Sequence, residues 1–209
     1  MGFISNFFKA IRKTSVNSPV AAGLYEQEFF SASALARSFK LNVPNINLQS
    51  RRFISDQLLQ KLPEHIHEHV GELTPEMLVT QCFFIHSLIK DPIEKLFGTE
   101  AYFTLGYVEL EKRNLFYHDE TYLSMLLKKG IQNPQLNLHA WITLSSMEII
   151  DFSLSTSYAY VNGDYEKSFG IIACHPDELK GHMKYHPTLV GDDFLKQIGA
   201  IQDIFMVSI

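Results

Sequence analysis

The sequence contains few cysteines, no long apolar run and no excess of basic residues. Only two of its 209 residues are cysteine, which argues against a disulfide framework and fits a reducing compartment. No stretch approaches the roughly 20 apolar residues that a transmembrane helix needs. The formal net charge is −5, so a nucleic acid is not an expected partner. We therefore expect a cytoplasmic protein without a transmembrane segment, and delivery to another cell stays open.

Motifs for phosphate binding and for serine nucleophiles are also missing. The sequence contains no glycine-rich phosphate loop and no serine-centred elbow. Its hydrophobic fraction of 46% and charged fraction of 20% are ordinary for a globular protein, and its length is sufficient for a full core. Chemistry is therefore to be sought in individual polar residues.

The first thirteen residues form an amphipathic pattern. Apolar side chains share one helical stripe at Phe3, Phe7, Phe8 and Ile11, and cations follow at Lys9, Arg12 and Lys13. A signal peptide carries its charges before the apolar run, so this segment is not one. Two interpretations stay open: a helix docked on the protein body or on a partner chain, and a helix that contacts a membrane surface.

Apolar periodicity predicts helices in the first half of the chain and strands in the second. Residues 26–39 and 50–62 carry apolar side chains at helical spacing. Strand patterns cover residues 101–110, 138–144, 148–154 and 169–174. Helices followed by a largely antiparallel sheet indicate the α+β class. We expect a helical region at 1–72 and a core at 73–209, together forming one compact domain.

Local signals predict the remaining boundaries. Pro63 is expected to end the helix at 50–62, and Asp91-Pro92 is expected to begin a new helix. Near the C-terminus, residues 185–191 are expected to form a docked loop and residues 192–201 a closing helix.

Cys82, His139 and Asp151 are the candidate catalytic residues. Cys82 opens an apolar helical run, His139 begins a strand, and Asp151 lies in the next strand. A thiol, an imidazole and a carboxylate are the parts of a thiolate nucleophile, its base, and the group that orients the base. Two strands joined by a short turn present His139 and Asp151 side by side when the register places both on one face.

The place of Cys82 in its helix is open from sequence alone. A single helix from Pro75 to Lys90 would put Cys82 in the middle, where the helix dipole contributes little. A short first turn followed by a new helix at Gln81 or Cys82 would put the thiol at the positive end of the dipole, which favours a thiolate.

The elements around these residues follow an order that is shared with a known family. A helix headed by Cys82 closes at Gly98, and strands follow that contain Gly106-Tyr107, His139-Ala140-Trp141 and Asp151. Over residues 75–155 this order resembles the transglutaminase-like branch of the papain-like cysteine enzymes. The resemblance implies a papain-like α+β core and cysteine-dependent acyl transfer on an amide or peptide bond, as in a peptidase, deamidase or transglutaminase. It also implies a protein or peptide substrate and no cofactor.

Gln81 and Trp141 are the candidates for binding the oxyanion or the substrate. Gln81 precedes the nucleophile, and Trp141 belongs to the His-Ala-Trp strand. The backbone N–H of Cys82 is a further candidate for an oxyanion donor.

Two departures from the family pattern motivate an alternative hypothesis. Apolar residues follow Cys82 where the family has small polar ones, and Phe152-Ser153 follow Asp151 where the family has Pro and Thr. The alternative is an interaction module that keeps the fold without the chemistry. A thiol sealed under Phe83 and Phe84 would favour the module, whereas a thiol that opens on a cleft beside His139 would favour the enzyme.

Three histidines outside the candidate triad are potential metal ligands. His65, His67 and His69 alternate in a hydrophilic stretch after Pro63. We interpret them as a solvated cluster beside a loop, and metal ligation is the alternative. Cys174 with its nearby histidines is a weaker zinc candidate, and we expect no metal there.

Overall fold

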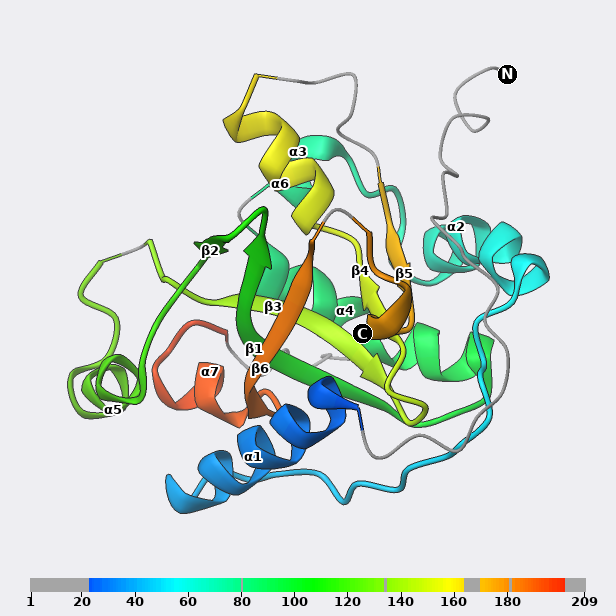
Figure 1. The fold of residues 1–209 in the computed structure, drawn as a ribbon. Helices are drawn as coiled ribbons and strands as arrows, with labels where there is room; N and C mark the ends of the chain where they lie inside the picture. Colours follow the sequence, from blue (N-terminus) through cyan, green and yellow to red (C-terminus); the bar gives the residue numbers. More distant parts are fainter. Residues whose placement is uncertain (1–22, 80, 134, 164–169, 181, 202–209) are drawn as a thin grey trace, which may run out of the picture.

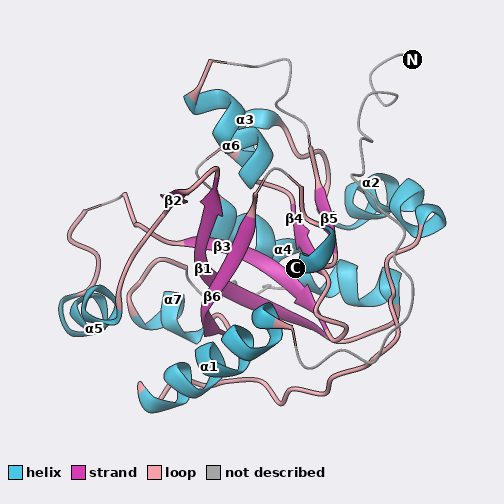
Figure 2. Cartoon of the chain, viewed as in Figure 1, coloured by secondary structure: helices cyan, strands magenta, loops and turns pink. Residues whose placement is uncertain are grey.

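The fold is built on a six-stranded sheet in which each described strand pairing is antiparallel (Figures 1 and 2). The structure, a computed structural model, describes residues 23–79, 81–133, 135–163, 170–180 and 182–201. Its strands are β1 (Ala101–Leu110), β2 (Arg113–Leu115), β3 (His139–Leu144), β4 (Ile149–Asp151), β5 (Ile172–Cys174) and β6 (Lys184–Val190). The order is β2-β1-β3-β4-β5, and β6 also pairs with β1. The predicted amphipathic helix at residues 1–13 lies outside the described residues.

Helices pack on both faces of this sheet (Figure 1). The described helices are α1 (Leu24–Ser38), α2 (Asp56–Val70), α3 (Pro75–Leu78), α4 (Cys82–Phe97), α5 (Glu120–Lys129), α6 (Leu154–Val161) and α7 (Asp193–Gln197). A single turn of 3-10 helix spans Pro176–Glu178. In the view of Figure 1, α4 lies behind the sheet and α1 lies across its lower near side.

Strand β3 shows how the two faces are divided. Its residues Ala140, Ile142 and Leu144 are buried in the cluster that contains the apolar stripes of α2 and α4. Trp141, which points to the opposite face, is buried with Tyr25 and Phe29 of α1. Every residue of β3 is buried, because a strand covered on both faces has no solvated side.

The α+β class is therefore confirmed. Helices from the first 72 residues share both hydrophobic clusters with the sheet, and the division at residue 72 stays a prediction. Among the described residues, no helix has the length and apolarity needed to cross a membrane.

Two predicted helix boundaries at proline are wrong. The helix predicted at 50–62 begins later, at Asp56, and continues through Pro63 to Val70. Helix α4 likewise continues through Pro92 to Phe97, where a new helix was expected. In both helices an apolar stripe on one face is fully or almost fully buried, and this burial outweighs the backbone hydrogen bond that proline removes.

The predicted docked loop at 185–191 is also wrong, because this segment contains most of strand β6. Strand β6 pairs with β1 from Glu109↔Lys184 to Thr104↔Val190. The register shifts between Leu105 and Gly106, and this irregularity accommodates Pro187, which cannot donate to a regular ladder. At the C-terminus, the expected closing helix is shorter than predicted and spans only Asp193–Gln197.

Gly106 allows three strands to approach one another. A Cβ atom at this position would lie 2.0 Å from the His186 carbonyl oxygen and 2.6 Å from Cη2 of Trp141. The first of these neighbours is backbone, which cannot move without disturbing the β1–β6 pairing. Glycine is therefore required here for packing between β1, β3 and β6.

We predict that Gly106→Ala destabilises the protein by about 3 kcal/mol, because overpacking beside a rigid backbone forces strand movement. Urea denaturation followed by circular dichroism measures the change. Gly23→Ala is the matched control, since the nearest atom to its added Cβ is 4.0 Å away. Equal destabilisation by the two substitutions would contradict this account of Gly106.

Candidate active site

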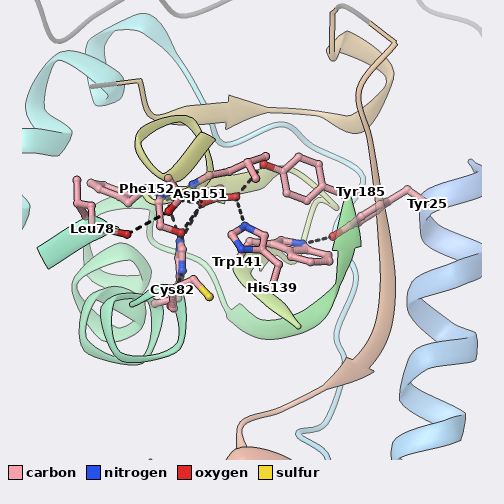
Figure 3. Close-up of polar contacts among 12 residues, drawn as sticks. Tyr25, Leu78, Cys82, His139, Trp141, Asp151, Phe152 and Tyr185 are labelled. Atoms are coloured by element: carbon pink, nitrogen blue, oxygen red, sulfur yellow. Dashed lines mark hydrogen bonds and ion pairs between the residues drawn. The ribbon is translucent and has the colours of Figure 1, made fainter. Parts of the chain in front are cut away.

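His139 and Asp151 are brought together by the β3–β4 hairpin. The observed register pairs Ile142 with Ile150 and Thr143 with Ile149. Continuing this register by one residue pairs Asp151 with Trp141, so His139 is the diagonal neighbour of Asp151 on the same face. His139 Nε2 lies 2.6 Å from Asp151 Oδ2, as Figure 3 shows. The predicted pairing of imidazole and carboxylate is therefore present.

Cys82 is the first residue of α4. Helix α3 ends at Leu78 and α4 begins at Cys82, so the chain forms two helices and the single helix from Pro75 to Lys90 is excluded. The first N–H groups of a helix have no intrahelical acceptor, and the dipole there favours negative charge. Gly98 closes α4 in the left-handed conformation, with φ of 62°, as the sequence predicts.

The thiol and the imidazole lie close together. Figure 3 shows the Cys82 sulfur on the side of α4 that faces the ring of His139, and Cys82 is near enough to raise the pKa of His139. Because Nε2 of His139 is bonded to Asp151, Nδ1 is the nitrogen available to Cys82. This is the connectivity that a thiol, a base and an orienting carboxylate require.

The charges of this group stabilise one another. Burial lowers the pKa of His139, but the adjacent Asp151 carboxylate and the Cys82 side chain together raise it to about 10. Burial raises the pKa of Asp151, but the charge of His139 and its hydrogen bond outweigh burial and hold that pKa well below its ordinary value. At neutral pH the pair is therefore an imidazolium and a carboxylate, and an imidazolium is the partner that a thiolate requires.

Both oxygens of Asp151 accept further hydrogen bonds. The Tyr185 hydroxyl donates to Oδ2 over 2.8 Å, beside His139. The backbone N–H groups of Ser153 and Leu154 donate to Oδ1 over 2.9 and 3.1 Å, and the Ser153 hydroxyl donates over 3.2 Å. A fully buried carboxylate needs this many donors to remain charged.

Sequence reasoning missed Tyr185 because it placed this residue in a loop. Tyr185, Pro187 and Leu189 are buried and alternate with less buried residues, which is the period of a strand. That alternation was the signal that could have located Tyr185.

His86 is a second buried histidine that sequence reasoning missed. Its Nδ1 donates to the Cys82 carbonyl over 2.8 Å, and its Nε2 accepts the N–H of Phe152 over 3.1 Å. Burial lowers the pKa of His86 to about 4, against the attraction of Asp151. The neutral ring therefore links the first turn of α4 to the end of β4. Its position one helical turn after Cys82, on the same face, was the available signal.

Trp141 lies inside the core, beside His139. Its ring is fully buried, and its Nε1 donates to the Tyr25 hydroxyl over 2.7 Å. The ring stacks beside His139, with centroids 6.0 Å apart. These contacts support the imidazole from within the core, and the substrate-binding role of Trp141 stays a prediction.

Gln81 lies where the sequence placed it, directly before the nucleophile. It occupies the N-cap position of α4 and is exposed. Its role as an oxyanion donor stays a prediction, together with that of the Cys82 N–H in the first turn of the helix.

The candidate catalytic residues are buried. Cys82 is 8% exposed and His139 is 1% exposed. Phe84 lies on the surface with 40% exposure, so it is not deeply packed over the thiol. The ring that covers His139 is Phe116, which stacks on the imidazole with centroids 5.1 Å apart and planes inclined by 16°.

The histidine cluster lies at the C-terminal end of α2, directly before the loop at 71–74. Ligand atoms of His65, Glu68 and His69 lie within 4.8 Å of one another, and among the described residues this is the group of potential metal ligands that converges. His65 Nε2 is bonded to the Pro92 carbonyl over 2.9 Å, and His69 Nδ1 to the His65 carbonyl over 2.8 Å. Each ring thus already has a backbone partner, as in an ordinary partly solvated cluster.

No protein-family model, curated protein or solved structure matches this chain. The functional assignment therefore rests on the residues and geometry of the site.

We predict that the His139–Asp151 pair loses its stabilising effect at high pH. A histidine whose folded-state pKa is raised from 6.5 to about 10 contributes stability that is fully present below pH 6.5 and is lost as the pH rises through 10. The difference in unfolding free energy between wild type and His139→Gln should shrink across this range. Urea denaturation of both proteins at pH 6, 8 and 10 measures it, and a constant difference would contradict the assigned charge state.

Proposed function

We propose that this protein is a cysteine-dependent acyl-transfer enzyme that acts on an amide or peptide bond. Cys82 is the nucleophile, His139 is the general base and acid, and Asp151 orients His139. The observation that carries the proposal is the connectivity of the imidazole. Its Nε2 is bonded to Asp151 over 2.6 Å, and the ring lies beside the thiol of Cys82, the first residue of a helix.

The proposed reaction has two halves. The Cys82 thiolate attacks the carbonyl carbon, and the developing oxyanion is stabilised by N–H groups in the first turn of α4. His139 gives its proton to the departing nitrogen as the C–N bond breaks, which leaves an acyl thioester. Water or an amine then attacks the thioester with proton transfer to His139, and the thiolate is released. Water makes the protein a peptidase or deamidase, and an amine makes it a transglutaminase-type enzyme.

The proposal includes membership of the transglutaminase-like branch of the papain-like fold. The order of the elements supports it: a helix headed by the cysteine, then an antiparallel hairpin that carries histidine and aspartate on one face. The proposed chemistry requires no cofactor, and its substrate is a protein or peptide. A free thiol at Cys82 agrees with a reducing compartment such as the cytoplasm.

The burial of the site supports a second candidate, the interaction module without catalysis. An enzyme must admit a carbonyl group to the Cys82 sulfur, yet Cys82 and His139 are almost completely covered. If the covering residues never move, the buried ion pair serves only the stability of the fold.

Cys82→Ala and Asp151→Asn test the enzyme. Three assays cover the acyl acceptors: dansylcadaverine incorporation into casein, ammonia release from casein, and cleavage of casein. We expect activity in at least one, and a loss of about 1,000-fold or more in Cys82→Ala, because removing a nucleophile abolishes the covalent route. Cys174→Ala is the matched control and should retain activity. Full activity in Cys82→Ala, with an unchanged circular dichroism spectrum, would disprove the proposal.

Thiol labelling separates the enzyme from the module without a known substrate. Burial raises the pKa of the Cys174 thiol to about 12, so this residue is an internal reference of low reactivity. We expect iodoacetamide at pH 7 to label Cys82 faster than Cys174, and His139→Ala to slow the labelling of Cys82 because the imidazolium partner of the thiolate is removed. Labelling that does not depend on His139 would favour the module.

A further inference from the structure

The segment that covers the catalytic histidine is held in an unfavourable backbone conformation. Phe116 has a φ of 62°, and Glu111 and Lys112 in the preceding turn have φ values of 49° and 68°. Residues with a Cβ rarely occupy this region, because the Cβ atom crowds the neighbouring backbone there. Such conformations persist only where surrounding contacts stabilise them.

The segment is less buried than the sheet beneath it. Strand β2, which leads into it, has three residues and pairs with β1 from Val108↔Leu115 to Leu110↔Arg113. Arg113 and Asn114 are exposed, and Leu115 and Phe116 are only partly buried where they pack on the cluster around Trp141. Moving this segment outward would therefore expose less apolar surface than moving β3, whose residues are all buried.

Phe116 packs on the cluster around Trp141 and Tyr185, and two specific contacts orient it. Its ring stacks on His139. Its carbonyl accepts a hydrogen bond from His118 Nδ1 over 3.0 Å, and His118 Nε2 lies 2.8 Å from the Thr188 hydroxyl of β6. Burial lowers the pKa of His118, so the ring is neutral and Nδ1 donates to the Phe116 carbonyl. The single proton of the Thr188 hydroxyl is then shared between His118 Nε2 and the Leu105 carbonyl, which lies 3.2 Å away. His118 thus connects the covering segment to the sheet.

We propose that Phe116 is the gate of the active site, and that its displacement admits the substrate acyl group to Cys82 and His139. Residues 115–118 form the gate segment, and the His118–Thr188 hydrogen bond is its latch. This inference rests on the proposed function, because a gate is needed only where a buried nucleophile must meet a substrate. It accounts for the covered site without assigning the protein to the inactive class.

Alkylation of Cys82 by iodoacetamide measures the opening of this gate. Reaction of a covered thiol is slowed by the fraction of time that the site is open. We expect Phe116→Ala to accelerate labelling of Cys82 by about 10-fold or more, as followed by mass spectrometry at pH 7, and to leave the rate at Cys174 unchanged. Phe30→Ala is the matched control, since Phe30 is a surface phenylalanine on α1. Phe116→Leu serves as a second variant if the alanine variant does not fold.

Thr188→Val tests the latch. It removes the hydroxyl that contacts His118 and the Leu105 carbonyl and preserves the shape of the side chain, so labelling of Cys82 should accelerate, by less than in Phe116→Ala. Because the latch acts only through Phe116, Thr188→Val should add nothing in the Phe116→Ala background. An additive effect of the two substitutions would overturn the latch.

The outcomes separate the gate from the proposed function. Labelling of Phe116→Ala at the wild-type rate, together with a dependence on His139, would overturn the gate and leave the enzyme standing. Faster labelling of Cys82 that no longer depends on His139 would keep the gate as a steric cover and remove the catalytic assignment. Equal acceleration at Cys82 and Cys174 would show general loosening of the fold and would also overturn the gate.

Discussion

The structure depends on one buried carboxylate. Asp151 is completely buried, and an isolated carboxylate in a protein interior is so unfavourable that it would take up a proton. It remains charged because His139 lies 2.6 Å away and other donors surround it. Those donors come from β3, from β6 and from the start of α6, so the charge is stabilised only when these elements occupy their native positions. This requirement makes Asp151 a constraint on the whole fold as well as a member of the site.

His86 connects Cys82, the proposed nucleophile, to the end of the strand that carries Asp151. Its ring bonds the Cys82 carbonyl at one nitrogen and the Phe152 N–H at the other, which fixes the first turn of α4 relative to the end of β4. On the face of the sheet covered by α1, Trp141 donates a buried hydrogen bond to Tyr25, and this bond links β3 to α1. The thiol, imidazole and carboxylate are therefore positioned by residues whose own contacts lie in the core. Such rigidity is expected of a site in which a small displacement of the base would prevent proton transfer.

The sequence was informative where local pattern decides the structure. The boundaries of β1 agree with its alternation, and Cys82, His139 and Asp151 were found from residue type and order, since the hairpin that joins the last two is local. Local patterns led to wrong predictions where the burial of apolar side chains outweighs the local effect of a proline. Pro63 was expected to end one helix and Asp91-Pro92 to begin another, yet both prolines lie inside helices whose apolar stripes are buried. Pro187 lies within β6, next to a register irregularity.

The residues that complete the site could not be found by local reasoning, because their roles depend on contacts that are distant in the chain. Tyr185 reaches Asp151 across 34 positions and His86 reaches Phe152 across 66. The stacking of Phe116 on His139 depends on how the β1–β2 hairpin folds over the sheet, and its φ of 62° has no signature in a phenylalanine. Residue type indicated the chemistry in this chain, whereas the long-range pairing of the sheet determined which side chains support it.

Burial and chemistry are connected in this site. A low-dielectric environment strengthens the attraction between His139 and Asp151 and lets a few hydrogen bonds hold the imidazole in one orientation. The same environment excludes the substrate as long as it stays closed. An open cleft would weaken the electrostatic interaction between His139 and Asp151, and a permanent cover would exclude the substrate of the proposed enzyme. A buried ion pair with a single aromatic side chain as its movable wall satisfies both requirements, since the charges are fixed by the core and only Phe116 has to move.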